Sequence, residues 1–335
     1  MSIKILLTTP DYPPKLGGLS TFTSNLESIL RQMGEVTLHV WDNVQQLTQF
    51  NSDQHFDWGI HVHFMGGVAA ARFCKKNLNF IHGSEVAFTS PNFIKRTFKK
   101  IMKRKFISYL EESHWNLFIS EFTRQFLVSK GLESDFSRDL VFHNLIDLKE
   151  NQLFGPSFTQ GPLQLVCIAR DVPHKNIDGA ITIAKNIQNQ IKREVVLTIN
   201  AMRDPSLHSN IKMVCLPNLS NEEREKIYQK SHFNLLPSLD FSSSGFFEGF
   251  GLTVLEAGKY GTPSIVFSDQ GGQGESVHHR LTGWSDLYSN REQIPQYISE
   301  FDEVSYQQLR VNTFQHTIDN HDKNFYKALL DGVLK

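Results

Sequence analysis

The sequence predicts two α/β domains, each built on a parallel β-sheet covered by helices. The first observation is length, since 335 residues exceed one ordinary hydrophobic core and suit two domains of roughly 150 residues each. The second is alternation, since short apolar runs alternate with helix-like patterns from residue 3, and the alternation restarts at residue 163. Two such domains should face each other across a deep cleft, with ligands at the carboxyl ends of the strands.

The first domain should begin with one βαβ unit. Residues 3–8 are apolar and precede a loop rich in proline and glycine, which predicts a strand followed by a loop. Apolar residues then recur at helical spacing over 19–33, Gly34 ends this pattern, and residues 36–41 supply the next strand.

The second domain should repeat this pattern after a stretch at 155–162 whose glycine, proline, serine and glutamine residues indicate a linker. Residues 163–169 predict a buried strand, a helical period marks 177–191, and residues 195–199 predict the next strand. We therefore place the two domains at residues 1–157 and 158–335, with room for the last helix to pack back on the first domain.

Composition excludes several classes of protein. Apolar residues make up 40% and charged residues 21%, the balance of a folded globular chain. The net charge of −1 provides no global field for nucleic-acid binding. Three distant cysteines without a Cys-x-x-Cys pair disfavour a disulfide framework or a zinc site, and they fit a reducing cytosol. No apolar run approaches the roughly 18 residues of a membrane-spanning helix, and the first residues resemble a strand more than a signal peptide.

The most informative segment lies between Glu248 and Glu256. A strand-like run and a polar loop precede the sequence Phe-Phe-Glu-Gly-Phe-Gly, and a short helix should start at Leu252. Glycines let a backbone approach a ligand closely, and the first amides of a helix attract an anion. The segment therefore predicts a phosphate site formed by the backbone of Phe250, Gly251 and Leu252.

The two glutamates of this segment can face one bound molecule, since Glu248 lies in the loop and Glu256 about one turn into the helix. A carboxylate accepts hydrogen bonds from neighbouring hydroxyls, which sugars offer. One glutamate can then hold a ribose while the other holds a transferred sugar. Taken alone, two acids at this spacing are more often ordinary surface residues.

Three motifs occur in and after this segment: Glu-Gly-Phe-Gly-Leu at 248–252, Leu-Glu-Ala at 255–257 and Gly-Thr-Pro-Ser-Ile at 261–265. Together they resemble the donor-binding signature of the retaining family-four glycosyltransferases, the glycosyl transferases group 1. Members of that family have the GT-B fold of two Rossmann-like domains. The resemblance runs from about residue 3 to residue 283 and is stronger in the second domain.

Five further positions match the family. Arg170 and Lys175 resemble its pyrophosphate-binding cations, and two fixed cations would neutralise the charge of a departing diphosphate. Gly17 and Gly18 resemble the first-domain loop that closes over the donor phosphate, and His82 resembles the histidine beneath the reacting sugar. A surface cation pair, a plain turn and a structural histidine explain the same residues when each is taken alone.

The resemblance implies a retaining, metal-independent hexosyltransferase, and the sequence contains no Asp-x-Asp triplet. Its donor would be a UDP- or GDP-sugar, a co-substrate, with no bound cofactor. Its acceptor would be a saccharide or a lipid-linked saccharide in bacterial surface polysaccharide or lipopolysaccharide synthesis. Glu248 and His82 would be the catalytic residues at the donor sugar, and Glu256 would hold the ribose.

A basic helix should span residues 93–110, where seven basic residues and no acid are interleaved with apolar side chains up to Leu110. Such a helix fits an anionic membrane surface, where each basic residue contributes about 1 kcal/mol. A solvated helix whose apolar face packs on the sheet fits the same pattern. We therefore expect a cytoplasmic protein with a possible peripheral position at the inner face of the membrane.

Other functions fit parts of this pattern. An epimerase or phosphorylase of the same fold would share the donor site, but only a transferase would depend on an acceptor while releasing the diphosphate. A non-catalytic GT-B subunit would usually lack the cations or the glutamates that this chain keeps. A nicotinamide dehydrogenase is disfavoured because the glycines at 17 and 18 lack the Gly-x-Gly-x-x-Gly spacing.

Overall fold

The computed structural model describes the chain from residue 2 to residue 334, apart from residues 16, 49, 84–92, 134, 136, 149–152, 154 and 209. Its contacts divide the chain into two compact units. Unit 1 comprises Met1–Asp147, Phe241–Gly249 and Asp322–Lys335, and unit 2 comprises Leu148–Asp240 and Phe250–His321. The short segment 241–249 therefore belongs to a different unit from the residues that flank it.

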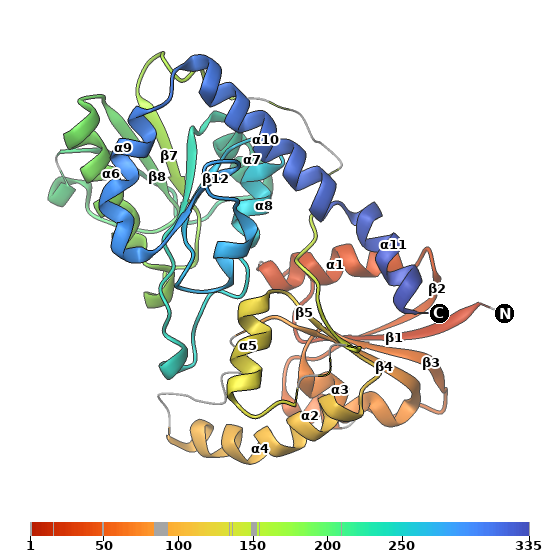
Figure 1. Ribbon diagram of the computed structural model, residues 1–335. Helices are drawn as coiled ribbons and strands as arrows, with labels where there is room; N and C mark the ends of the chain where they lie inside the picture. Colours follow the sequence, from red (N-terminus) through yellow and green to blue (C-terminus); the bar gives the residue numbers. More distant parts are fainter. Residues whose placement is uncertain are drawn as a thin grey trace. The chain divides into compact units, whose positions relative to one another are not determined.

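Unit 1 is built on a six-stranded parallel sheet with the order β2-β1-β3-β4-β5-β6. Its strands are β1 (Ile3–Thr9), β2 (Gly34–Val40), β3 (Phe56–His61), β4 (Cys74–Ile81), β5 (Trp115–Phe118) and β6 (Asp139–Val141). Its α-helices are α1 (Gly18–Leu30), α2 (Val44–Thr48), α3 (Phe64–Ala70), α4 (Phe93–Glu112), α5 (Glu121–Ser129) and α11 (Lys323–Val333) (Figure 1). Alternation along β1 directs Leu7 to the cluster that contains α1 and α11, whereas Leu6 packs with Ala70 of α3.

Unit 2 is built on a second six-stranded parallel sheet, with the order β12-β11-β10-β7-β8-β9. Its strands are β7 (Leu163–Cys167), β8 (Val195–Ile199), β9 (Lys212–Cys215), β10 (Phe233–Leu236), β11 (Ser264–Phe267) and β12 (Gly283–Asp286). Its α-helices are α6 (Ile177–Ile191), α7 (Asn221–Lys230), α8 (Leu252–Gly258), α9 (Ile294–Ser299) and α10 (Glu303–His321). Two parallel sheets flanked by helices confirm the predicted fold class.

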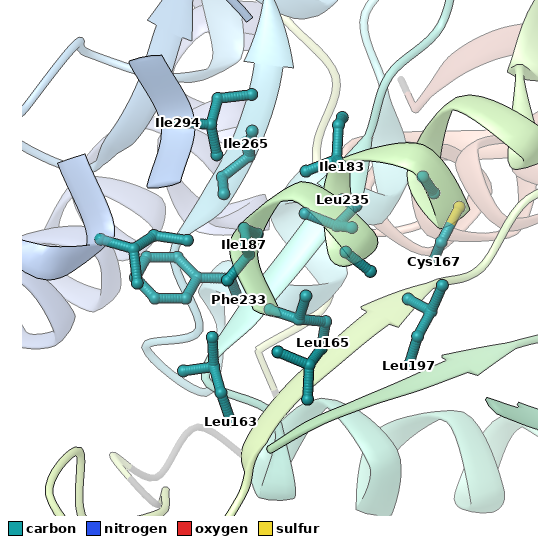
Figure 2. Close-up of a cluster of buried hydrophobic side chains, with 14 of the residues drawn as sticks. Leu163, Leu165, Cys167, Ile183, Ile187, Leu197, Phe233, Leu235, Ile265 and Ile294 are labelled. Atoms are coloured by element: carbon teal, nitrogen blue, oxygen red, sulfur yellow. The ribbon is translucent and has the colours of Figure 1, made fainter. Parts of the chain in front are cut away.

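The central strand β7 shows how the sequence assigns the two faces of this sheet. Leu165 lies in one core cluster with Ile187 of α6 (Figure 2). The next residue, Val166, lies in a second cluster with Tyr228 of α7 and Ala257 of α8. Because neighbouring strand residues point to opposite faces, α6 covers one face, and α7 and α8 cover the other.

Most predicted element bounds agree with the structure. The helix predicted over 177–191 is α6, and the strand predicted over 195–199 is β8. The helix predicted over 19–33 ends earlier, at Leu30, because residues 31–33 form a turn that leads into β2.

Segment 155–162, whose composition indicates a linker, is packed on unit 2. Phe158 is buried in the main core of this unit, and Ser157 donates a hydrogen bond of 2.7 Å to Glu303 of α10. The contacts accordingly divide the chain after Asp147 instead of within the segment. The composition of the segment does not predict this packing, because the packing depends on the burial of one aromatic side chain, that of Phe158.

The last helix, α11, belongs to unit 1. Tyr326 donates from its hydroxyl to the backbone oxygen of Phe142 at 3.4 Å, and the Trp58 indole donates to the backbone oxygen of Leu334 at 3.1 Å. The carboxyl-terminal residues therefore complete the core on one face of the unit 1 sheet. Among the helices that the structure describes, none is long and apolar enough to cross a membrane.

Candidate active site

The sheet of unit 2 reverses its winding between β7 and β10. The chain passes from β7 to β8 on one side and later returns to β10 on the other side of β7. Connections that leave neighbouring parallel strands in opposite directions open a crevice at the carboxyl ends, which is where such sheets bind ligands. The residues that follow β7 include Arg170 and Lys175, and the long connection after β10 leads to Phe250, Gly251 and Leu252.

Hydrogen bonds fasten the loop after β7 to the residues after β10. The Leu239 amide donates to the His174 carbonyl at 2.8 Å, and the Asn176 side chain donates to the Pro237 carbonyl at 2.9 Å. Asn176 has φ of 52°, a left-handed conformation that asparagine tolerates, and its side chain also caps α6 by accepting from the Gly179 amide. The loop that carries the predicted cations is therefore held at the carboxyl ends of β7 and β10.

Two arginines beside this loop have different surroundings. Arg203 donates to both carboxylate oxygens of Asp171, at 2.8 and 2.9 Å, and to Asp178 at 2.9 Å. Arg170 is exposed and has no carboxylate partner among the described residues, and Lys175 is half-buried. Because Arg203 engages the adjacent Asp171, the positive charge of Arg170 remains available to an anionic ligand.

The start of α8 requires a glycine. Gly251 has φ of 91°, and a Cβ at this position would lie 2.6 Å from Cδ2 of Leu236. No side chain in the described part of the chain caps α8, so the first backbone amides of the helix lack a side-chain acceptor. Gln273 lies beside Gly251 and donates to the Ser238 carbonyl at 3.2 Å, which joins the loops after β10 and β11.

Glu256 lies on α8 in a largely buried position, with 18% of its side chain exposed. Arg224 of α7 lies 3.4 and 3.5 Å from its two oxygens, and the buried Tyr228 donates to one of them at 3.3 Å. Burial raises the pKa of the Glu256 carboxyl, and the charges of Arg224 and Lys259 oppose this rise. Glu256 is therefore an oriented carboxylate whose charge depends on nearby cations.

Arg224 and Tyr228 were not predicted as site residues from the sequence. A signal for their helix exists, since Ser220 and Glu223 form a complete capping box at the start of α7. Residues four apart on such a helix share one face. The apolar and polar pattern of α7 does not predict which of its faces contacts Glu256, because Glu256 lies thirty-two residues after Arg224.

In unit 1 the segment before Phe250 lies against the end of β4. A Cβ at Gly249 would lie 2.1 Å from the backbone oxygen of His82, and a Cβ at Gly83 would lie 3.0 Å from the ring of Phe247. The structure thus brings the backbone that carries Glu248 directly onto His82 and Gly83. These contacts place the two predicted catalytic residues in one part of unit 1.

An aromatic anchor holds the same segment. The ring of Phe247 lies 5.3 Å from that of Phe122 and 4.9 Å from that of Phe126, both on α5. Phe247 is buried, and Glu248 beside it is only 9% exposed. Packing of Phe247 therefore fixes the backbone from which Glu248 extends.

His82 is held as a neutral imidazole. Its ring meets Phe22 of α1 edge to face, with 4.5 Å between ring centroids. Burial, reinforced by the neighbouring His63, lowers the pKa of His82 to about 3. At neutral pH the ring can donate one hydrogen bond and accept another, as the positioning of a sugar hydroxyl requires.

Gly17 precedes α1 and Gly18 is its first residue. Both lie at the winding reversal of the unit 1 sheet, where β1 lies between β2 and β3. Gly17 has an extended backbone, with φ of 165°, and a Cβ there would make an ordinary contact of 3.4 Å with Asp11. The local backbone therefore does not require glycine at residue 17. Binding of a donor phosphate by Gly17 and Gly18 stays a prediction.

Comparison with known families identifies the carboxyl-terminal part of the chain. Residues 149–304 match the family described as glycosyl transferases group 1. No curated protein sequence matches the chain.

Solved structures extend the likeness to the whole chain. A sucrose-phosphate synthase from Thermosynechococcus elongatus has a TM-score of 0.74 at 14% identity, with 99% of this chain and 98% of that chain covered. A glycosyltransferase from Rickettsia africae gives 0.70 at 15% identity, with 100% and 98% covered. Anabaena HepE in complex with UDP-glucose gives 0.65 at 14% identity, with 99% of both chains covered. At these identities the likeness establishes the fold, which is GT-B, as predicted.

Proposed function

Since residues 149–304 match the glycosyl transferases group 1 family, we propose that this protein transfers a sugar from a nucleotide-sugar donor to a saccharide or lipid-linked acceptor. The observation that carries the proposal is the winding reversal of the unit 2 sheet. There the loop after β7 presents Arg170, which has no carboxylate partner among the described residues, together with Lys175. Two cations near the start of a helix, at the carboxyl ends of parallel strands, suit a nucleoside diphosphate.

Each proposed donor contact has a matching chemical group. Arg170, Lys175 and the first amides of α8, near Gly251 and Leu252, would bind the diphosphate and stabilise its charge as it departs. Glu256 would accept hydrogen bonds from the ribose hydroxyls. The backbone of Phe250, which precedes these amides, and the loop at residues 17–18 complete the set that we assign to donor binding.

We assign the transferred sugar to Glu248 and His82. Their placement in one part of unit 1 supports this assignment, and the neutral state of His82 suits a hydrogen bond to a sugar hydroxyl. The reaction would retain the anomeric configuration, because the acceptor hydroxyl attacks from the face that the diphosphate leaves. Stabilisation of the leaving group by protein cations would then make a metal ion unnecessary.

The donor nucleotide that we propose is UDP or GDP. The complex of Anabaena HepE with UDP-glucose, a protein of the same fold, supports UDP as the first candidate. A thermal-shift series with UDP-, GDP-, ADP- and dTDP-sugars tests this choice, since a ligand at one hundred times its Kd stabilises the folded state by about 2.7 kcal/mol. Stabilisation by none of the four would contradict the proposed donor class.

Transfer itself is tested with the donor that binds. Release of the nucleoside diphosphate only when a saccharide acceptor is added supports a glycosyltransferase. Release without an acceptor, or conversion of the donor into an isomer, would instead support the epimerase or phosphorylase alternative. Donor binding without any turnover over a broad acceptor set would support a non-catalytic subunit.

Helix α4 supports a position at an anionic membrane surface. We further propose bacterial surface polysaccharide synthesis as the pathway of this enzyme. Ile94 and Ile101 are 77% and 64% exposed, and Lys100, Arg104 and Lys105 are exposed on the same helix. Exposed apolar side chains among cations are typical of a helix that lies in a membrane interface. A lipid-linked acceptor at the cytoplasmic face would then be within the reach of the enzyme.

Co-sedimentation with vesicles tests this position. Binding should increase with the fraction of phosphatidylglycerol and should fall when Arg104 and Lys105 are replaced by glutamate. The matched control replaces Lys212 and Lys226 of unit 2, two exposed lysines outside α4, and should bind as the wild type does. Binding that is independent of anionic lipid would contradict the membrane assignment.

A further inference from the structure

A network of three side chains joins α7 to α8 at the residue proposed to hold the ribose. Arg224 and Tyr228 come from α7, and Glu256 comes from α8. Both α7 residues direct polar atoms to the same carboxylate, Arg224 at 3.4 and 3.5 Å and Tyr228 at 3.3 Å. We propose that Arg224 and Tyr228 are positioning residues that hold Glu256 as an ionised acceptor for the ribose hydroxyls of the donor. This inference rests on the proposed function, which assigns Glu256 to the ribose.

The distances suit a carboxylate that is oriented but not saturated. All three contacts are longer than the 2.7–2.9 Å typical of charge-assisted hydrogen bonds. An ionised carboxylate offers about four acceptor positions, so two ribose hydroxyls can bind while Arg224 and Tyr228 stay in place. The exposed fractions agree, because the Glu256 side chain is 18% exposed whereas Tyr228 is 1% exposed.

Arg224 also has the surroundings of a fixed group. Its guanidinium donates a second hydrogen bond to Asn221 in the first turn of α7. Only 26% of its side chain is exposed. A guanidinium with two partners loses less freedom on binding than a free surface arginine, so it can orient Glu256 before the ligand arrives.

The charges around Glu256 make its ionisation depend on Arg224. Burial raises the pKa of Glu256, whereas the charges of Arg224 and Lys259 lower it. The other titratable groups that face Glu256 from α7 are Glu225 and the hydrogen-bonded Tyr228. Removing Arg224 would leave burial opposed mainly by Lys259, so the pKa of Glu256 would rise further. A protonated carboxyl is a poorer acceptor for two hydroxyls than a carboxylate.

The structure supplies a matched control in the same pair of helices. Lys259 of α8 forms an ion pair of 2.6 Å with Glu225 of α7. This pair ties the helices together without contacting the Glu256 carboxylate directly. Glu225→Gln therefore loosens the α7 and α8 contact as Arg224→Ala does, but it leaves Arg224 on Glu256.

The experiment measures binding by titration calorimetry with UDP and 2′-deoxy-UDP, or with GDP and 2′-deoxy-GDP if GDP is the nucleotide that binds. The wild type should prefer the ribose form. Arg224→Ala should lose about tenfold or more in affinity for the ribose form and most of its preference over the deoxy form, the scale of a lost charge-assisted hydrogen bond. Arg224→Lys should recover part of this loss, and Glu225→Gln should keep both the affinity and the preference.

A pH series separates the effect of Arg224 on the charge of Glu256 from its effect on the orientation of the Glu256 side chain. The affinity of Arg224→Ala relative to the wild type should recover as pH rises from 6 to 9, because higher pH ionises Glu256 again. Titration of the nucleotide phosphates affects both proteins equally. The ratio of the two affinities therefore reflects only titration of groups in the protein. A pH-independent ratio together with an unchanged ribose preference would overturn the inference.

The binding data distinguish failure of the proposed function from failure of the proposed positioning role. If the wild type binds none of the four nucleoside diphosphates UDP, GDP, ADP and dTDP, the proposed function is wrong. If the wild type binds one of them with a ribose preference that Arg224→Ala and Tyr228→Phe both keep, the function stands and the positioning role is wrong. Thermal melting checks folding, and Tyr228→Phe, which removes a single hydroxyl, carries the test if Arg224→Ala does not fold.

Discussion

The two glutamates of the segment between residues 248 and 256 are held by different means in different units. The backbone next to Glu248 is fixed by close packing, with Gly249 on the His82 carbonyl and Phe247 against α5 in unit 1. Glu256 is oriented by polar contacts, chiefly from Arg224 of unit 2. The chain passes from one unit to the other between Gly249 and Phe250.

This difference shows that one short sequence signature is not one structural element. Its first half depends on how closely two backbones approach, which only small residues permit. Its second half depends on helix register and on a cation from another helix. Substitutions in the first half should therefore change sugar transfer and the stability of unit 1, whereas substitutions in the second half should change nucleotide binding.

The largest effect should follow Glu248→Gln. Loss of the charge at the transferred sugar should lower the transfer rate by about a hundredfold to a thousandfold, the scale of removing one preorganised stabilising group. The Kd for UDP should change little, because UDP lacks the sugar. Steady-state kinetics and calorimetry measure the two quantities, and a parallel loss in both would place Glu248 on the nucleotide instead.

A smaller effect should follow Gly249→Ala. A Cβ would meet the His82 carbonyl at 2.1 Å, so the backbone must shift, at a cost of about 1 to 3 kcal/mol in the free energy of unfolding. The matched control is Gly332→Ala in α11, where nothing lies within 4 Å of the new Cβ, and which should gain about 0.4 to 1 kcal/mol. Denaturant unfolding of both variants measures this, and equal stabilities would refute the close approach.

Glu256→Gln should raise the Kd for UDP by about tenfold, since one charge-assisted hydrogen bond to the ribose weakens. The rate of transfer at saturating donor should stay within a few-fold of the wild type. Full activity with unchanged donor affinity would remove Glu256 from the site. Comparison with Glu248→Gln then separates binding from transfer.

The smallest effect concerns acid stability and distinguishes the two units. Burial lowers the pKa of His61 to about 4 and that of His82 to about 3 in unit 1, and that of His232 to about 4 in unit 2. Below pH 6.5 the unfolded chain binds protons that these folded imidazoles do not, so stability is present above pH 6.5 and is lost as pH falls. Burial also lowers the pKa of His39 and His114, both in unit 1, so unit 1 should lose more stability per pH unit than unit 2 as pH falls.

Limited proteolysis with mass spectrometry at pH 7.5 and pH 5 checks this prediction. Cleavage at pH 5 should appear first at sites in unit 1. Earlier cleavage within unit 2 would contradict the assignment of buried neutral histidines to unit 1.

Apolar patterning in the sequence predicted the fold class and the bounds of several elements. Apolar residues at helical and strand spacing predicted α6 and β8 with the bounds that the structure has, because a half-buried helix or strand must repeat its apolar side with the period of its backbone. The same period in both halves predicted two parallel sheets. The glycines between Glu248 and Glu256 predicted a phosphate site from local order, whereas Arg170 and Lys175 were assigned to the donor through the family resemblance.

Contacts between residues that are distant in the chain determine which side chains act together. The assignment of residues 241–249 to unit 1, the burial of Phe158 and the contact of Arg224 with Glu256 all join residues far apart in the chain. An arginine on an amphipathic helix has the same sequence signature whether it faces water or a carboxylate. Its partner is fixed by how α7 and α8 pack on the sheet, and that packing is a property of the whole unit, not of either helix.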